Sequence, residues 1–172
     1  MSSRITLHDG PAVGFDQPFE MLAACHDRVR RSLDLLQRLQ AHVQRHGLDG
    51  QAREAAADVL RYFDIAGPAH HEDEERHVLP RLHAAGLAAL AERLHADHGE
   101  MAALWAALRE PLQAWSRGEA AALDPGRVER YAALYAAHMT LEDGQAFAAA
   151  RAGLDDAALA AMGAEMSARR KT

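Results

Sequence analysis

The chain has 172 residues, enough for one domain with a buried core, and its formal net charge is -6 with histidine counted as neutral. The negative charge gives no basic footprint for nucleic acid, and the only run of three consecutive basic residues is Arg169-Arg170-Lys171. No apolar run approaches the roughly 20 residues that span a bilayer, so we expect neither a nucleic-acid nor a membrane partner. The single cysteine, Cys25, and the lack of a secretory signal pattern indicate the reducing cytoplasm.

Alanine and leucine supply most of the apolar residues while aromatic residues make up only 5%, a composition that favours helices over strands. Residues 1–16 are expected to be irregular because they contain two glycines and a proline. Residues 17–47 read as one helix, since apolar residues recur every three or four positions and Gly47 is a natural end. A second helix is expected over residues 51–86, with a kink or short break at Gly67-Pro68.

A third helix is predicted over residues 87–115. The fourth begins at Asp124-Pro125, with Asp124 as the cap and Pro125 in the first turn, and ends near Gly153. A short tail helix follows over residues 155–169. Four long helices joined by short loops predict an all-α protein, an antiparallel up-down-up-down four-helix bundle with a short C-terminal helix. The predicted organisation is an irregular N-terminal segment (1–16), the bundle (17–152) and the tail helix (153–172).

Histidine is unusually frequent, with eleven in the chain. Each predicted long helix carries at least one, in chain order His26, then His70, His71 and His77, then His95 and His98, then His138. Two His-x-x-x-Glu pairs occur: His70 with Glu74 (or His71 with Glu75), and His138 with Glu142. A spacing of four places both side chains of a pair on one helix face. Because metal sites form where such side chains converge inside a bundle, the pattern indicates a site for iron, zinc, copper or manganese.

A purely structural interpretation competes with this one. A His-x-x-x-Glu pair on a charged helix is often a surface pair worth a few tenths of a kcal/mol, and a single histidine more often serves other roles than ligation. The second pair, however, has apolar neighbours at Leu134, Ala137 and Leu141. A buried Glu142 without a partner would cost several kcal/mol, and a metal ion would compensate it.

Four stretches in combination, "CHDRV", "HHEDEERHVLPRL", "DHGEM" and "HMTLEDGQAF", resemble the hemerythrin-like (HHE cation-binding) domain family over roughly residues 17–152. The resemblance implies a four-helix bundle with a non-haem centre of two iron ions, joined by an oxo or hydroxo bridge. It also implies a small-molecule ligand, namely oxygen, nitric oxide or peroxide. Carried over residue by residue, the metal ligands are His26, His70, Glu74, His98, His138 and Glu142, with the two glutamates as bridging carboxylates.

The adjacent pair His71 and Glu75 offers an alternative register. In the family motif the glutamate stands six residues before a proline, with large apolar residues at the fourth and fifth positions. Counting from Glu74 fits this pattern and ends at Pro80, whereas the fifth residue after Glu75 is already the proline. We therefore favour His70 with Glu74, and expect His71 and Glu75 beside the ligands, able to hydrogen-bond them or to tune proton access.

Two features depart from the oxygen-carrying hemerythrins that the chain resembles. Those proteins have two third-helix ligand histidines spaced by four, whereas His95 and His98 are spaced by three, which makes His95 a weaker candidate. Their fourth-helix motif ends in an aspartate after five residues, whereas this chain has Glu142 after four. Four histidines and two glutamates leave more coordination positions open, which favours binding and reduction of small molecules over protected oxygen storage. The remaining histidines, His42, His46, His77 and His83, are expected at the surface, with His77 a further candidate for a position beside the ligands.

The function expected from the resemblance is binding, sensing or detoxification of a small ligand at the di-iron centre. Three alternatives stay open at this point. One is catalytic turnover of peroxide or nitric oxide at the same centre, and another is donation of iron for the repair of damaged metal centres. The third is a metal-free bundle that acts through protein interactions.

Overall fold

The computed structural model describes residues 13–171 and is helical, with no strand in that range, which confirms the predicted all-α class. Residues 1–12 of the predicted irregular segment lie outside the described residues. None of the described helices is long and apolar enough to cross a membrane. The elements in chain order are α1 (Pro18–His46), α2 (Gly50–Arg61), the π-helical η1 (Tyr62–Ala66), α3 (Gly67–His77), α4 (Leu79–Ala84), α5 (Ala88–Ser116), α6 (Pro125–Leu141), the π-helical η2 (Glu142–Ala146), α7 (Phe147–Arg151) and α8 (Asp156–Arg169).

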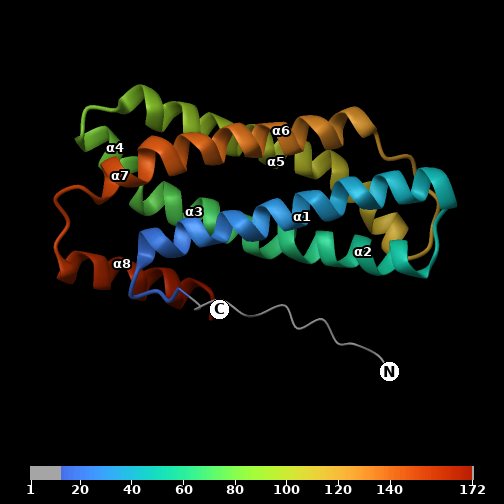
Figure 1. Cartoon of the computed structure of the whole chain (residues 1–172), viewed down its shortest axis with the longest axis horizontal. Coiled ribbons are helices and arrows are strands. Elements are labelled where there is room, and N and C mark those ends of the chain that lie inside the picture. The colour runs from blue at the N-terminus through green and yellow to red at the C-terminus, as the bar shows by residue number, and fades with distance from the viewer. Residues whose placement is uncertain (1–12, 172) are drawn as a thin grey trace.

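The long helices enclose a shared core. Helix α1 packs against α2 and α6, and α5 packs against the same two helices (Figure 1). The buried apolar residues form two separate clusters, one around Leu36, Leu108 and Tyr131 and the other around Leu22 and Leu82. Each long helical stretch contributes to both clusters, so a gap between them crosses the middle of the molecule. Polar side chains fill that gap.

The predicted helix ends are confirmed at the positions with the clearest signals. Helix α1 ends at His46, directly before Gly47, whose φ of 83° favours glycine. Asp124 caps α6 by accepting a hydrogen bond from the backbone N–H of Gly126, with Pro125 at the first helical position.

Two π-helical segments interrupt the predicted second and fourth helices. Segment η1 ends directly before Gly67-Pro68, the predicted break, where the N–H of Gly67 bonds to the carbonyl of Tyr62 five residues earlier. Pro68 lacks an N–H, so the regular pattern cannot continue through it. Segment η2 begins at Glu142, and its last turn is closed by the N–H of Phe147. Such π segments often mark functional sites, because the extra residue changes which side chains face inward.

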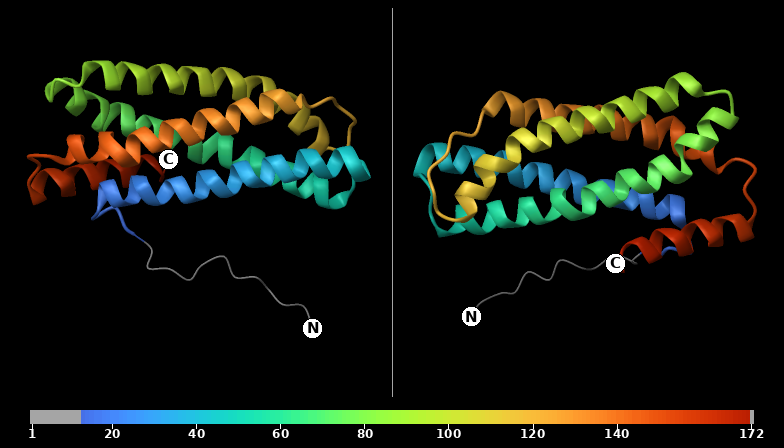
Figure 2. Two further views of the ribbon diagram at one scale, coloured as in Figure 1. Left: turned by 45° about the horizontal axis from the view of Figure 1, so that its top comes forward. Right: turned by 180° about the vertical axis from the view of Figure 1, so that it is seen from behind.

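The tail helix α8 lies along the outside of the bundle against α1 and α3 (Figure 2). Its basic end, Arg169 and Arg170, pairs with the fully buried carboxylate of Asp73 in α3. His77 Nε2 lies 2.5 Å from Glu165 Oε2 in α8. His77 therefore contacts the tail helix, and this contact gives no support to its candidate position beside the metal ligands.

A close backbone approach at Gly163 gives a first testable prediction. A Cβ at this buried position would lie 1.6 Å from the carbonyl oxygen of Phe15. Glycine to alanine normally stabilises a helix interior by about 1 kcal/mol, but here α8 must shift. We expect Gly163→Ala to lower the free energy of unfolding by about 1–3 kcal/mol in urea denaturation. Gly99→Ala, whose Cβ would meet nothing within 4 Å, should stabilise instead. Stabilisation by both changes would contradict the packing of α8.

Candidate metal centre

The polar gap between the two apolar clusters holds six side chains that are at most 4% exposed: His26, His70, Glu74, His98, His138 and Glu142. They come from α1, α3, α5, α6 and the first residue of η2. These are the six ligands expected from the sequence, and the structure brings all of them together. On each helix they occupy the level at which one apolar cluster ends and the other begins.

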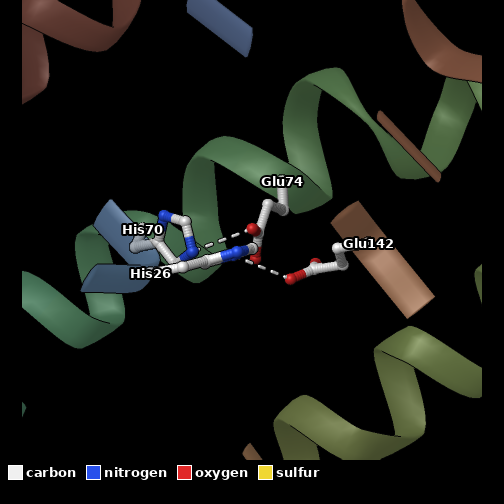
Figure 3. A group of neighbouring side chains, drawn as sticks. All are labelled: His26, His70, Glu74 and Glu142. Carbon is white, nitrogen blue, oxygen red and sulfur yellow. Dashed lines mark ion pairs between the residues drawn. The ribbon is translucent and has the colours of Figure 1, made fainter. Parts of the chain in front are cut away.

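The six side chains form two overlapping groups of four. The first is His26, His70, Glu74 and Glu142 (Figure 3), and the second is Glu74, His98, His138 and Glu142. Within each group the candidate ligand atoms all lie within 4.8 Å of one another. The histidines divide into two pairs, one in each group, whereas both glutamates belong to both groups.

The individual contacts show how each glutamate connects the two groups. Glu74 presents Oε1 to His70 Nε2 at 2.9 Å and Oε2 to His98 Nε2 at 3.3 Å. Glu142 presents Oε2 to His26 Nε2 at 3.1 Å and Oε1 to His138 Nε2 at 3.1 Å. Every carboxylate oxygen thus faces one histidine, and the two oxygens of one carboxylate face different groups.

The hydrogen bonding of these atoms tests whether a metal fits. Among the described residues, no hydrogen bond with acceptable geometry reaches either oxygen of Glu74 or Glu142, or Nε2 of His26, although all are buried. His98 Nε2 and His138 Nε2 face each other at 3.2 Å. Buried polar atoms without partners are rare and costly. Cations placed among these nitrogens and oxygens would satisfy them, and this donor set suits iron, zinc, copper or manganese.

A comparison with protein families decides where this arrangement belongs. The family model of the hemerythrin HHE cation-binding domain matches residues 17–150. The chain belongs to this family. An uncharacterized protein of Haemophilus influenzae is 31% identical to it over 159 residues, which cover 91% of this chain and 92% of the relative. The buried cluster of histidine and glutamate therefore lies in a cation-binding HHE domain.

Carboxylates outside the cluster orient three of its four histidines. His26 Nδ1 lies 2.9 Å from Asp143, His98 Nδ1 lies 2.9 Å from Glu75, and His138 Nδ1 lies 3.4 Å from Asp97. An N–H donated from Nδ1 to a carboxylate leaves Nε2 as the lone-pair nitrogen that binds metal. The sequence analysis missed Asp97 and Asp143. Their positions next to His98 and Glu142 were the signal that could have found them.

His70 has a different neighbourhood. Burial lowers the pKa of His70, but Glu74 and the Cys25 side chain act more strongly together, so the pKa lies well above the usual 6.5. Burial raises the pKa of Glu74, but His70 and His98 outweigh it and hold the pKa well below 4.5. Burial lowers the pKa of His138 whereas Glu142 raises it, and the net result is again a raised pKa. In the metal-free protein the two opposite shifts favour the charged forms of His70 and Glu74.

The structure also shows where the weaker candidates lie. His71 is in neither group of four. Its ring stacks on His98, with centroids 4.1 Å apart and planes at 12°, and burial lowers its pKa well below 6.5. Glu75 contacts the outer nitrogen of His98, the position expected for a residue beside the ligands. His95 is exposed and outside both groups.

Proposed function

We propose that this protein is a non-haem di-iron protein that binds a small diatomic or peroxide ligand, such as oxygen or nitric oxide, in a binding, sensing or detoxifying role. One observation carries the proposal. Glu74 and Glu142 belong to both four-residue groups, and the two oxygens of each face different groups. A single ion needs no such sharing, whereas two adjacent ions do.

In this proposal His26 and His70 hold one iron, His98 and His138 hold the other, and the two glutamates bridge them. The bound iron pair supplies redox chemistry and coordination positions for the ligand. The chain itself supplies orientation, because the carboxylates of Asp143, Glu75 and Asp97 fix the outer nitrogens of three histidines.

The surroundings of the centre are also part of the proposal. Apolar clusters pack on either side of the ligands, each of which is at most 4% exposed. We further propose the antiparallel up-down-up-down bundle as the frame that holds them, with residues 153–172 as an appended tail. The single cysteine of the chain, Cys25, favours the reducing cytoplasm as the location of the protein.

Metal analysis is the experiment that tests this function. Anaerobic loading with ferrous iron, removal of excess metal and oxidation should give two irons per chain by elemental analysis. Mössbauer spectra should show a magnetically coupled pair. One metal ion per chain, or zinc retained after careful iron supply, would overturn the di-iron proposal. Stopped-flow mixing of the reduced protein with oxygen, nitric oxide and peroxide then identifies the ligand.

A further inference from the structure

A groove lies between α3 and α5 and has a volume of about 880 Å³. It reaches the outer side of the centre, because His98 and Glu75 line it together with His71. Phe63, Met101, Trp105 and Tyr135 supply apolar walls. The volume falls in the range of roughly 300–1,000 Å³ that is typical of pockets for organic ligands, far more than a diatomic molecule needs.

The charged groups of this α3–α5 groove make it unfavourable for anions. It is lined by three carboxylates, Asp64, Glu72 and Glu75, and by one guanidinium, that of Arg109. Arg109 is already engaged, since its Nε lies 2.8 Å and 3.0 Å from the two oxygens of Asp64. The groove therefore carries a net negative field, which repels negatively charged ligands.

The carboxylates are also engaged. Glu75 contacts His98, and Glu72 pairs with Arg76 at 2.6 Å. A ligand in the groove would thus find few charged groups available to it.

His71 offers a buried polar atom to a ligand in the groove. Its Nε2 is buried and has no hydrogen-bond partner among residues 13–171. Its ring is held by stacking on His98 and on Tyr135, the latter at 5.7 Å between centroids. A buried imidazole nitrogen without a partner is costly unless a ligand satisfies it. The fixed ring places this hydrogen-bonding group beside a candidate metal ligand.

We propose that the α3–α5 groove binds an uncharged organic hydroperoxide. Its apolar body lies against Phe63, Met101 and Trp105, and its hydroperoxyl end hydrogen-bonds His71 next to His98. The apolar walls suit the body of the ligand, and the negative field of the groove disfavours anions. The hydroperoxyl end suits His71, because this group can both donate a hydrogen bond to an imidazole and accept one from it. The choice of a hydroperoxide as the ligand class rests on the proposed redox function of the iron pair. Binding of the ligand in the groove itself needs no metal.

The test uses the metal-free protein and cumyl alcohol, the unreactive alcohol that corresponds to cumene hydroperoxide. Binding is followed by tryptophan fluorescence, to which Trp105 in the groove contributes together with Trp115, and by saturation-transfer NMR. We expect saturable binding, and at least tenfold weaker binding of phenylacetate, an anion of similar size. Because no metal is present, a failure here is distinct from a failure of the iron analysis.

Variants locate the site. Gly99 faces open space and lines the groove, so Gly99→Leu should fill it and weaken cumyl alcohol binding about tenfold or more. Ala102→Leu gives a second blocking variant should the first fold poorly. His71→Phe keeps an aromatic ring but removes the nitrogens, and should weaken binding about tenfold. Ala133→Leu, exposed and outside the groove, is the matched control. No binding, unchanged affinity in the blocking variants, or phenylacetate binding as well as the alcohol would overturn the proposal.

Discussion

Replacement of Glu74 by glutamine is expected to remove both metal ions rather than one. The reason is that the two oxygens of Glu74 face His70 in one group and His98 in the other. The amide keeps the size of the carboxylate but loses its charge and one of its two acceptor atoms. Since a bridging ligand serves both ions, its loss weakens both positions together. Elemental analysis after iron loading and buffer exchange should show near-complete loss of iron.

Glu75→Gln is the matched control, because it makes the same chemical change one residue away. Glu75 contacts the outer nitrogen of His98, Nδ1, rather than the inward-facing Nε2. Changes at such partners typically lower metal affinity about 10–100-fold without abolishing binding, so this variant should retain both ions at saturating iron. If Glu75→Gln lost the metal and Glu74→Gln kept it, the alternative register of His71 and Glu75 would be right. Far-ultraviolet circular dichroism checks that both variants fold.

Iron loading is expected to raise the melting temperature by roughly 8–16 °C for each ion bound, when free metal exceeds its dissociation constant about 1,000-fold. Within residues 13–171, the metal-free fold buries the carboxylates of Glu74 and Glu142 without acceptable hydrogen bonds, and metal ions would relieve that cost. The unfolded chain has no preformed site, so binding free energy adds to folding. Differential scanning calorimetry with and without a chelator measures the effect.

The size of this shift should depend on pH. The pKa of His70 in the folded, metal-free protein is raised well above 6.5, despite burial, chiefly by Glu74. Its stabilising contribution is complete below pH 6.5 and is lost as the pH rises through the raised pKa. Metal binding needs the neutral imidazole, so protons compete with metal at His70 and His138 and affinity rises with pH. The gap between loaded and metal-free melting temperatures should therefore widen from about pH 6 to about pH 8.

A histidine variant separates this explanation from general effects of pH. His70→Gln should flatten the pH dependence of the metal-free protein, whereas His83→Gln, at an exposed position, should leave it unchanged. A temperature gap that stays constant over this range, or two variants that behave alike, would show that the His70–Glu74 pair does not control the response.

Much of the fold was readable from local sequence signals. The end of α1 at Gly47 and the start of α6 at Asp124-Pro125 were predicted correctly because a left-handed glycine and a capping aspartate act within one turn of helix. The two π-helical segments were not predicted, although Pro68 marked the first of them. Glu142 was placed at the centre by its spacing from His138, a relation that the helix period fixes.

The sequence by itself thus determined the helices and which histidine and glutamate share a helix face, because both depend on contacts three to five residues apart. Tertiary structure decided what meets across helices. It placed Asp143 on His26 and Glu75 on His98, opened the groove beside His71, and docked Arg170 on the buried Asp73. Such pairs lie far apart along the chain, and their meeting depends on how each helix is rotated and how its side chains pack, which no local period encodes.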